Sequence, residues 1–193
     1  NFNLDFPQDL HNMGINMYVR PGPARTWVGR TALPYDSWIP SILFLTHYLP
    51  DDPKESQEVN LASLILGQNG IWGDLLSMSE DGIGRFARTL ALYKQVRDDI
   101  TAAPPVRSGR IGGSPEIHEK INPANGRGAV VAFATQAGSY PYATVRSVDS
   151  RVSHGEGVTI RLNPDGRAVL DLSFPVPGAK IIFFGVDQAP RTE

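Results

Sequence analysis

The spacing of apolar residues changes near Ile100, and this change limits the possible folds more than any other feature of the sequence. Between residues 77 and 100, apolar side chains recur every three or four positions, which is typical of an amphipathic helix. Ser77-Met78-Ser79-Glu80 matches a capping box, and Pro104-Pro105 follows the last turn. We therefore predict one long helix over residues 77–100.

Beyond this helix, short apolar runs alternate with turn sequences. Strand character is found in six runs: residues 116–121, 129–135, 142–145, 158–162, 168–174 and 180–186. Asn-Pro-Asp-Gly-Arg at residues 163–167 predicts a hairpin in which Gly166 takes a positive φ, and residues 122–128 predict a second turn. Short strands with turns every ~8–12 residues indicate an antiparallel β-sandwich.

The first hundred residues mix loops, helices and short apolar runs. We expect mostly loop over 1–37 with a short strand at 15–19, a helix over 38–49, and a helix starting near Pro53 with Asp51 or Asp52 as its cap. Residues 61–66 could be strand or helix. The fold class is therefore α/β plus all-β, with one domain over 1–103 and a second over 104–193.

Charge and composition exclude several classes of function. The net charge is −2 with no basic stripe, which argues against nucleic acid as a partner, and no apolar run reaches the ~20 residues of a membrane helix. The absence of cysteine excludes disulfides, cysteine zinc sites and a cysteine nucleophile. The chain starts at Asn1 without a leader pattern, so we expect a mature form or a piece of a longer protein, either cytoplasmic or secreted.

No complete catalytic motif is present, and carboxylates are the best candidates for chemistry. The four histidines lack the spacing of a metal site, so no metal is expected. Asp74 follows Trp72 at a predicted strand end, where an aromatic ring and a carboxylate could bind a sugar; alternatively, Asp74 caps a turn and Trp72 is core. Asp36, near Arg30 and two aromatic residues, could be an acid/base or a sugar ligand, or could cap the following helix.

Other polar residues are expected to be structural. Asp98 and Asp99 are interpreted as solvated charges at a helix end. Glu116, His118 and Glu119 are interpreted as the solvated face of a strand. Tyr140 and Tyr142 could form an exposed aromatic platform, although cross-strand packing fits them better.

Residues 69–100 resemble the end of the catalytic barrel in melibiase-type glycoside hydrolases, the α-galactosidase clan. The positions that carry the resemblance are Gly73, Asp74, Leu75, Ser79, Glu80, Tyr93, Lys94 and Arg97. Residues 114–134 are similar to the first strands of the C-terminal β-sandwich of that clan. The likeness covers residues 61–135 and implies the last elements of a (β/α)8 barrel followed by an antiparallel β-sandwich.

The resemblance also implies an activity. Members of the clan are retaining glycosidases that use two aspartates and no cofactor, so this chain would act on α-galactosides or related α-glycosides. The nucleophile would lie upstream of Asn1, and Asp36 would be the candidate acid/base. Residues 70–74 would form the eighth strand and its loop, with Trp72, Asp74 and Arg30 binding the substrate. The chain would be inactive alone, would need the remainder of the enzyme or another copy, and would expose a large apolar surface on residues 38–100.

Two alternatives remain open. The chain could be a non-enzymatic carbohydrate-binding or adhesion module that binds sugar through Tyr140 or Trp27. It could also be a degenerate member of the clan with a structural role only.

Overall fold

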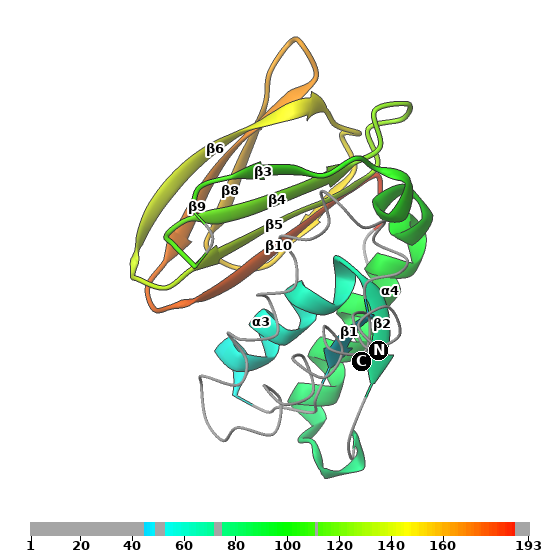
Figure 1. Ribbon diagram of the computed structural model, residues 1–193, viewed down its shortest axis with the longest axis vertical. Coiled ribbons are helices and arrows are strands. Elements are labelled where there is room, and N and C mark those ends of the chain that lie inside the picture. The colour runs from blue at the N-terminus through cyan, green and yellow to red at the C-terminus, as the bar shows by residue number, and fades with distance from the viewer. Residues whose placement is uncertain (1–44, 49–52, 72–74, 111, 188–193) are drawn as a thin grey trace, which may run out of the picture.

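The structure, a computed structural model, describes residues 45–48, 53–71, 75–110 and 112–187. Two helices are followed by eight strands that form two antiparallel sheets, stacked in the order helices, five-stranded sheet, three-stranded sheet (Figure 1). The predicted combination of a mixed α/β part and an all-β part is confirmed. None of the helices in the described ranges combines the length and the apolar character needed to cross a membrane.

The mixed part contains two parallel strands joined by a helix. Strand β1 (Leu45–Tyr48) pairs with β2 (Gln68–Ile71), and helix α3 (Lys54–Ile65) connects them. Residues 45–48 are therefore strand where a helix was expected, and residues 61–66 fall largely within a helix. Pro53, rather than Asp51 or Asp52, occupies the N-cap position of α3 and forms no side-chain cap. The rest of that predicted helix, residues 38–44 and 49, lies outside the described residues, as do the predicted loop over 1–37 and strand at 15–19. Over the four residues of β1 alone, the apolar pattern does not distinguish a helix from a strand.

A short 3₁₀ turn (η3, Leu75–Ser77) leads into the long helix α4 (Glu80–Ala102). The predicted helix is thus confirmed, but it starts three residues later than expected. Ser79 is the N-cap and its Oγ accepts a hydrogen bond from the Gly82 backbone N–H at 3.1 Å. The predicted capping box is wrong because Gly82, not a glutamate, occupies the third position of the helix.

The five-stranded sheet has the order β3-β4-β5-β10-β7. Its strands are β3 (Val106–Ser108), β4 (Glu116–Ile121), β5 (Gly128–Ala134), β10 (Gly178–Phe184) and β7 (Val152–His154). Three of them were predicted within two residues. The two edge strands were missed because three residues carry too little pattern to be recognised.

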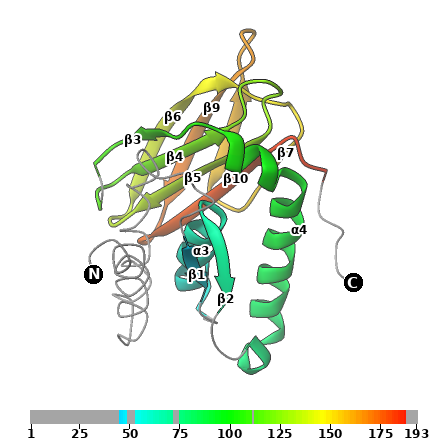
Figure 2. The ribbon, with the colours of Figure 1, turned by 45° about the vertical axis from the view of Figure 1, so that its right-hand side comes forward.

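The three-stranded sheet has the order β6-β9-β8. Its strands are β6 (Gly138–Ser147), β8 (Val158–Leu162) and β9 (Arg167–Phe174). The hairpin between β8 and β9 is confirmed: Asn163 N–H donates to Arg167 O at 2.8 Å, and Gly166 has a φ of +81°. This hairpin projects from the sandwich as the loop at the top of Figure 2.

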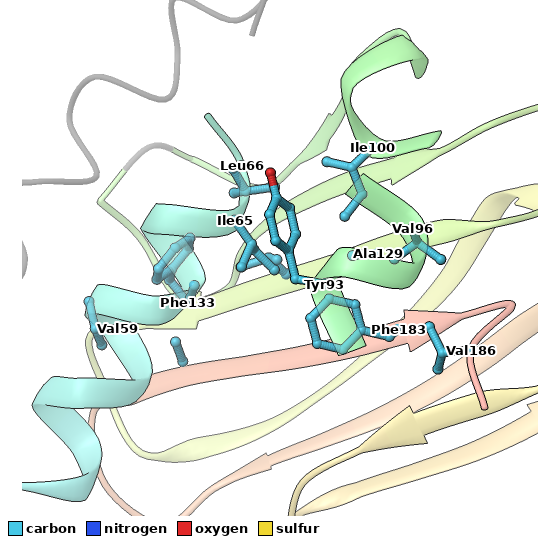
Figure 3. Close-up of a cluster of buried hydrophobic side chains, with 13 residues drawn as sticks. Val59, Ile65, Leu66, Tyr93, Val96, Ile100, Ala129, Phe133, Phe183 and Val186 are labelled. Atoms are coloured by element: carbon cyan, nitrogen blue, oxygen red, sulfur yellow. The ribbon is translucent and has the colours of Figure 1, made fainter. Parts of the chain in front are cut away.

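Two apolar cores lie on opposite faces of the five-stranded sheet. Between the sheets, residues such as Ile117, Val130 and Ile182 meet Leu170 and Phe174. On the other face, α3 and α4 pack against β5 and β10; Figure 3 shows Ile65, Tyr93, Val96, Phe133 and Phe183 in this cluster. Strand β5 is buried on both faces, which explains its unbroken apolar sequence.

Strand β4 is buried along its whole length, so its predicted solvated face is wrong. Glu116, His118, Glu119 and Lys120 are each 3% exposed or less. His118 Nε2 lies 2.9 Å from Glu116 Oε1, and the Gly112 N–H donates to Glu116 Oε2 at 2.7 Å. The alternation of charged and apolar residues suggested solvent, but here hydrogen-bond partners take the place of water.

Asp99 joins α4 to the sandwich and is not the solvated charge that was expected. Its side chain, 16% exposed, accepts hydrogen bonds from Asn122 (2.9 Å), Asn125 (2.8 Å) and Arg127 (3.0 Å). These donors come from the predicted turn between β4 and β5. The neighbouring Asp98 is 93% exposed, as predicted.

Candidate functional site

The residues predicted to bind or cleave a sugar lie outside the described residues. This is the case for Arg30, Asp36, Trp72 and Asp74, and also for Trp27. The structure does describe the strand that precedes two of them: β2 ends at Ile71, directly before Trp72. Their roles in a sugar site therefore stay predictions.

The two strands of the parallel pair end at the same edge of their sheet. Tyr48 and Ile71 are paired in the ladder, so β1 and β2 end at the same edge. Helix α3 contacts both strands. In parallel α/β folds, ligands bind at the carboxyl ends of the strands, because loops of varied sequence converge there.

A groove with a volume of about 680 Å³ lies between the two helices and strand β10. Residues of α3 and α4, including Glu58 and Arg85, form its walls, and Ala179, Ile181 and Phe183 of β10 contribute apolar surface. The segment 153–156, at the end of β7, closes one side. We name this cavity the α3–α4 groove.

Gln57 fixes the two helical walls relative to each other. Its side chain is fully buried; Nε2 donates to the Gly82 carbonyl at 2.7 Å, and Oε1 accepts from Arg85 Nε at 2.6 Å. A buried amide that bonds in both directions fixes the spacing of the first turns of α3 and α4. Arg85, which this contact holds, also lines the groove.

The segment that closes the groove is held by two lysines. Lys54 Nζ lies 2.9 Å from Glu156 Oε2, and Lys180 Nζ donates to the Glu156 carbonyl at 2.8 Å. The hydrogen bond from Lys54 lowers the pKa of the Glu156 carboxyl. Glu156 therefore connects three segments: the start of α3, the turn after β7 and strand β10.

Glu58 is the half-buried carboxylate of the groove. Burial raises the pKa of the Glu58 carboxyl above its usual value, while the positive charges of Lys180, Lys54 and Arg85 act against this rise. No side chain in the described part of the chain donates a hydrogen bond to it. A carboxylate near several cations but bonded to none of them retains acceptor capacity for a ligand.

The groove combines charged and apolar side chains. It offers hydrogen-bond donors on Lys and Arg, acceptors on Asp and Glu, and an apolar floor from β10, so it is more polar than a typical small-molecule site and suits a polar ligand. Among the residues in the described ranges, no group of three or more His, Asp or Glu side chains could hold a metal ion.

Sequence inspection missed this groove because its parts are distant in the chain. Lys54 and Glu156 are 102 residues apart, and Lys180 belongs to a third segment. One local signal was available: Gln57 is a polar residue near the start of a helix that continues with the apolar residues Val59, Leu61, Leu64 and Ile65. Such a residue, when buried, needs a partner on another element.

Tyr140 and Tyr142 do not form the exposed aromatic platform that the carbohydrate-binding alternative would use. Tyr142 is buried, and the ring of Tyr140 lies 5.9 Å from that of Phe174, on an adjacent strand. The preferred interpretation, packing between strands, is therefore confirmed for both tyrosines.

Comparison with known proteins gives a limited result. The sequence matches no known family profile and no curated protein. The structure is similar over most of the chain to an α-galactosidase I from Mortierella vinacea (11% identity, TM-score 0.43, 73% of this chain and 39% of that one). It is also similar to a candidate α-galactosidase from Bacteroides fragilis (15% identity, TM-score 0.40, 67% of this chain and 29% of that one). The chain thus spans less than half the length of either protein.

Proposed function

We propose that this chain is the C-terminal part of a retaining glycoside hydrolase that acts on α-galactosides or related α-glycosides. The observation that carries the proposal is the order β1, α3, β2, α4 with a parallel strand pair, followed directly by an eight-stranded sandwich packed on both helices. Parallel strands joined by helices are the repeating unit of a (β/α)8 barrel. The sequence resemblance of residues 61–135 to the α-galactosidase clan supports the same proposal.

In this proposal, β1 and β2 are the last two barrel strands, and the two parts meet between Ala103 and Pro104. Trp72 and Asp74 follow the carboxyl end of β2 and would bind the sugar, together with Arg30. Asp36 would be the acid/base, and the nucleophile would lie upstream of Asn1. The carboxylate pair would cleave the glycosidic bond through a covalent intermediate without a cofactor.

The proposal predicts a large exposed apolar surface on residues 38–100, and the described residues show little of one. Upstream barrel strands would need an apolar surface to pack on, yet within the described residues of 53–100 the large exposed apolar side chains are Leu76 (91% exposed) and Ile83 (42%). Both lie at or near the start of α4. A barrel contact would be expected to centre there.

The test compares the natural full-length protein with the 193-residue chain. We expect the longer protein to hydrolyse p-nitrophenyl α-galactoside with retention of configuration, and the isolated chain to be inactive. Asp74→Asn in the longer protein should lower kcat/KM by about tenfold to a hundredfold, because a charged hydrogen bond to the sugar is lost. Activity of the isolated chain, or an Asp74→Asn variant as active as the wild type, would contradict the proposal.

A further inference from the structure

We propose that the α3–α4 groove binds a carbohydrate chain through Glu58, Lys180 and Arg85. The ligand class, a neutral polyhydroxylated molecule, follows from the side chains of the groove. Its identification as a carbohydrate rests on the proposed function.

The donors and acceptors of the groove match hydroxyl groups. Glu58 can only accept when ionised, whereas Lys180 and Arg85 can only donate. Within the described residues, Lys180 and Lys54 act on Glu58 through their charges and form no hydrogen bond to it, so its carboxylate can accept hydrogen bonds from a ligand in the groove that all three residues line. A hydroxyl both donates and accepts, and neighbouring hydroxyls of one sugar ring can therefore bind both kinds of side chain.

The groove carries charges of both signs in nearly equal number, which suits a neutral ligand that can both donate and accept hydrogen bonds. Four cationic side chains line it (Lys54, Arg85, Arg88 and Lys180), against three carboxylates (Glu58, Asp81 and Glu156). One cation and one carboxylate, Lys54 and Glu156, already neutralise each other at 2.9 Å. Three cations and two carboxylates remain, so a charged ligand of either sign would meet side chains of its own sign in the groove.

The size and the floor of the groove fit the same class. About 680 Å³ lies within the range of roughly 300–1,000 Å³ that is usual for small-molecule sites. Leu92 and Ile181 are only partly buried and line the cavity, so the C–H faces of a sugar could pack on them. Gln57 and the contacts of Glu156 hold the walls in place before binding, which reduces the entropy lost on association.

The experiment titrates the 193-residue chain, labelled with ¹⁵N, with raffinose, an α-galactoside trisaccharide, and separately with sodium phosphate. We expect saturable chemical-shift changes at the amides of Glu58, Arg85 and Lys180 with raffinose and none with phosphate. Glu58→Gln and Lys180→Gln should each weaken binding about tenfold. Arg161→Gln, an exposed charge on β8, is the matched control and should leave the affinity unchanged.

The outcomes separate this inference from the proposed function. Asp74→Asn should leave the groove shifts intact, because the proposed function assigns Asp74 to the site that follows β2 rather than to the groove. Shifts that occur only outside the groove and disappear in Asp74→Asn would overturn the groove site and leave the proposed function standing. A response to phosphate alone, no response to raffinose, or unchanged affinity in both groove variants would also overturn it.

Discussion

The hydroxyl of Tyr142 donates a 2.7 Å hydrogen bond to Oε2 of Glu119, and this bond joins the two sheets of the sandwich. The Glu119 carboxylate also accepts from the backbone N–H groups of Val145 (2.8 Å) and Arg146 (3.0 Å). These two amides lie where the pairing of β6 with β9 is interrupted, between Ala143 and Ser147. A fully buried carboxylate thus replaces the partners that the irregular strand has lost.

We expect removal of this carboxylate to destabilise the sandwich severely. Glu119→Ala should lower the free energy of unfolding by roughly 3–5 kcal/mol, because one buried and two partly buried donors lose their acceptor. Tyr142→Phe should cost only about 1–2 kcal/mol, since one of three bonds is removed. Urea denaturation measures both. Ser139→Ala, at an exposed position of the same strand, is the control, and a Glu119→Ala variant within about 1 kcal/mol of wild type would contradict this account.

The Tyr142 hydroxyl should remain a donor throughout the accessible pH range. Burial, together with the hydrogen bond to Glu119 and its negative charge, raises the pKa of Tyr142 far above its usual value. We expect Tyr142 to contribute no tyrosinate absorbance in the folded protein as pH rises, so that Tyr142→Phe leaves the folded-state titration unchanged, whereas in urea wild type should gain the absorbance of one more tyrosine than the variant. In Glu119→Gln the charge is absent, so the titration of Tyr142 should move to lower pH. Identical titrations of wild type and Glu119→Gln would contradict the assignment.

Asp99 should make the junction between α4 and the sandwich sensitive to acid. Burial alone would raise the pKa of the Asp99 carboxyl, but hydrogen bonds from Asn125, Asn122 and Arg127 outweigh it and hold the pKa below its usual value. A lowered folded-state pKa means that the stabilisation is present above the unfolded pKa of about 3.9 and is lost as pH falls through the folded value.

Asp99→Asn should therefore cost about 2 kcal/mol of unfolding free energy at pH 7, and the difference from wild type should shrink below about pH 4. Urea denaturation at several pH values measures this. Asp98→Asn is the matched control: Asp98 is exposed, its bond to Arg97 is a surface ion pair, and its loss should cost less than about 0.5 kcal/mol at any pH. A difference for Asp99→Asn that is constant with pH would rule out the ionised carboxylate as the cause.

The elements that could be predicted from the sequence are those whose pattern is long and local. Helix α4 runs for 23 residues, and its apolar spacing identified it. Strands β4 and β8 were predicted with their observed bounds, because turn sequences delimit them. Edge strands β3 and β7 have three residues each and pair only through contacts that no local pattern records.

The polar contacts could not be predicted, because they depend on residues far apart in the chain. Glu119 and Tyr142 are 23 residues apart, and Asp99 and Arg127 are 28. A charged residue in a strand usually faces water, so solvent exposure was the reasonable expectation for Glu119. The same reason hid the α3–α4 groove, whose charges come from four separate segments.

Gly126 should tolerate no side chain. Its φ is +72°, and an added Cβ would lie 2.6 Å from the Asp149 backbone nitrogen, which donates to the Gly126 carbonyl. Gly126→Ala should therefore cost about 2 kcal/mol or more, from both the left-handed conformation and the close contact. Gly155→Ala is the control because a Cβ added there would meet no atom within 4 Å, and it should be neutral or slightly stabilising. Equal midpoints of urea unfolding for the two variants would contradict the conformational argument.

Ser79 should contribute to stability as the cap of α4. Its hydroxyl accepts from the Gly82 N–H at 3.1 Å, and without it one amide of the first turn loses its partner. Ser79→Ala should lower the free energy of unfolding by about 1 kcal/mol, whereas Ser79→Asp should retain the wild-type value, because aspartate also caps helices and carries a charge that favours the helix N-terminus. Ser77→Ala tests the alternative position of the cap. If Ser77 capped α4, Ser77→Ala would lower the free energy of unfolding and Ser79→Ala would not. Thermal unfolding of the three variants distinguishes the two positions of the cap.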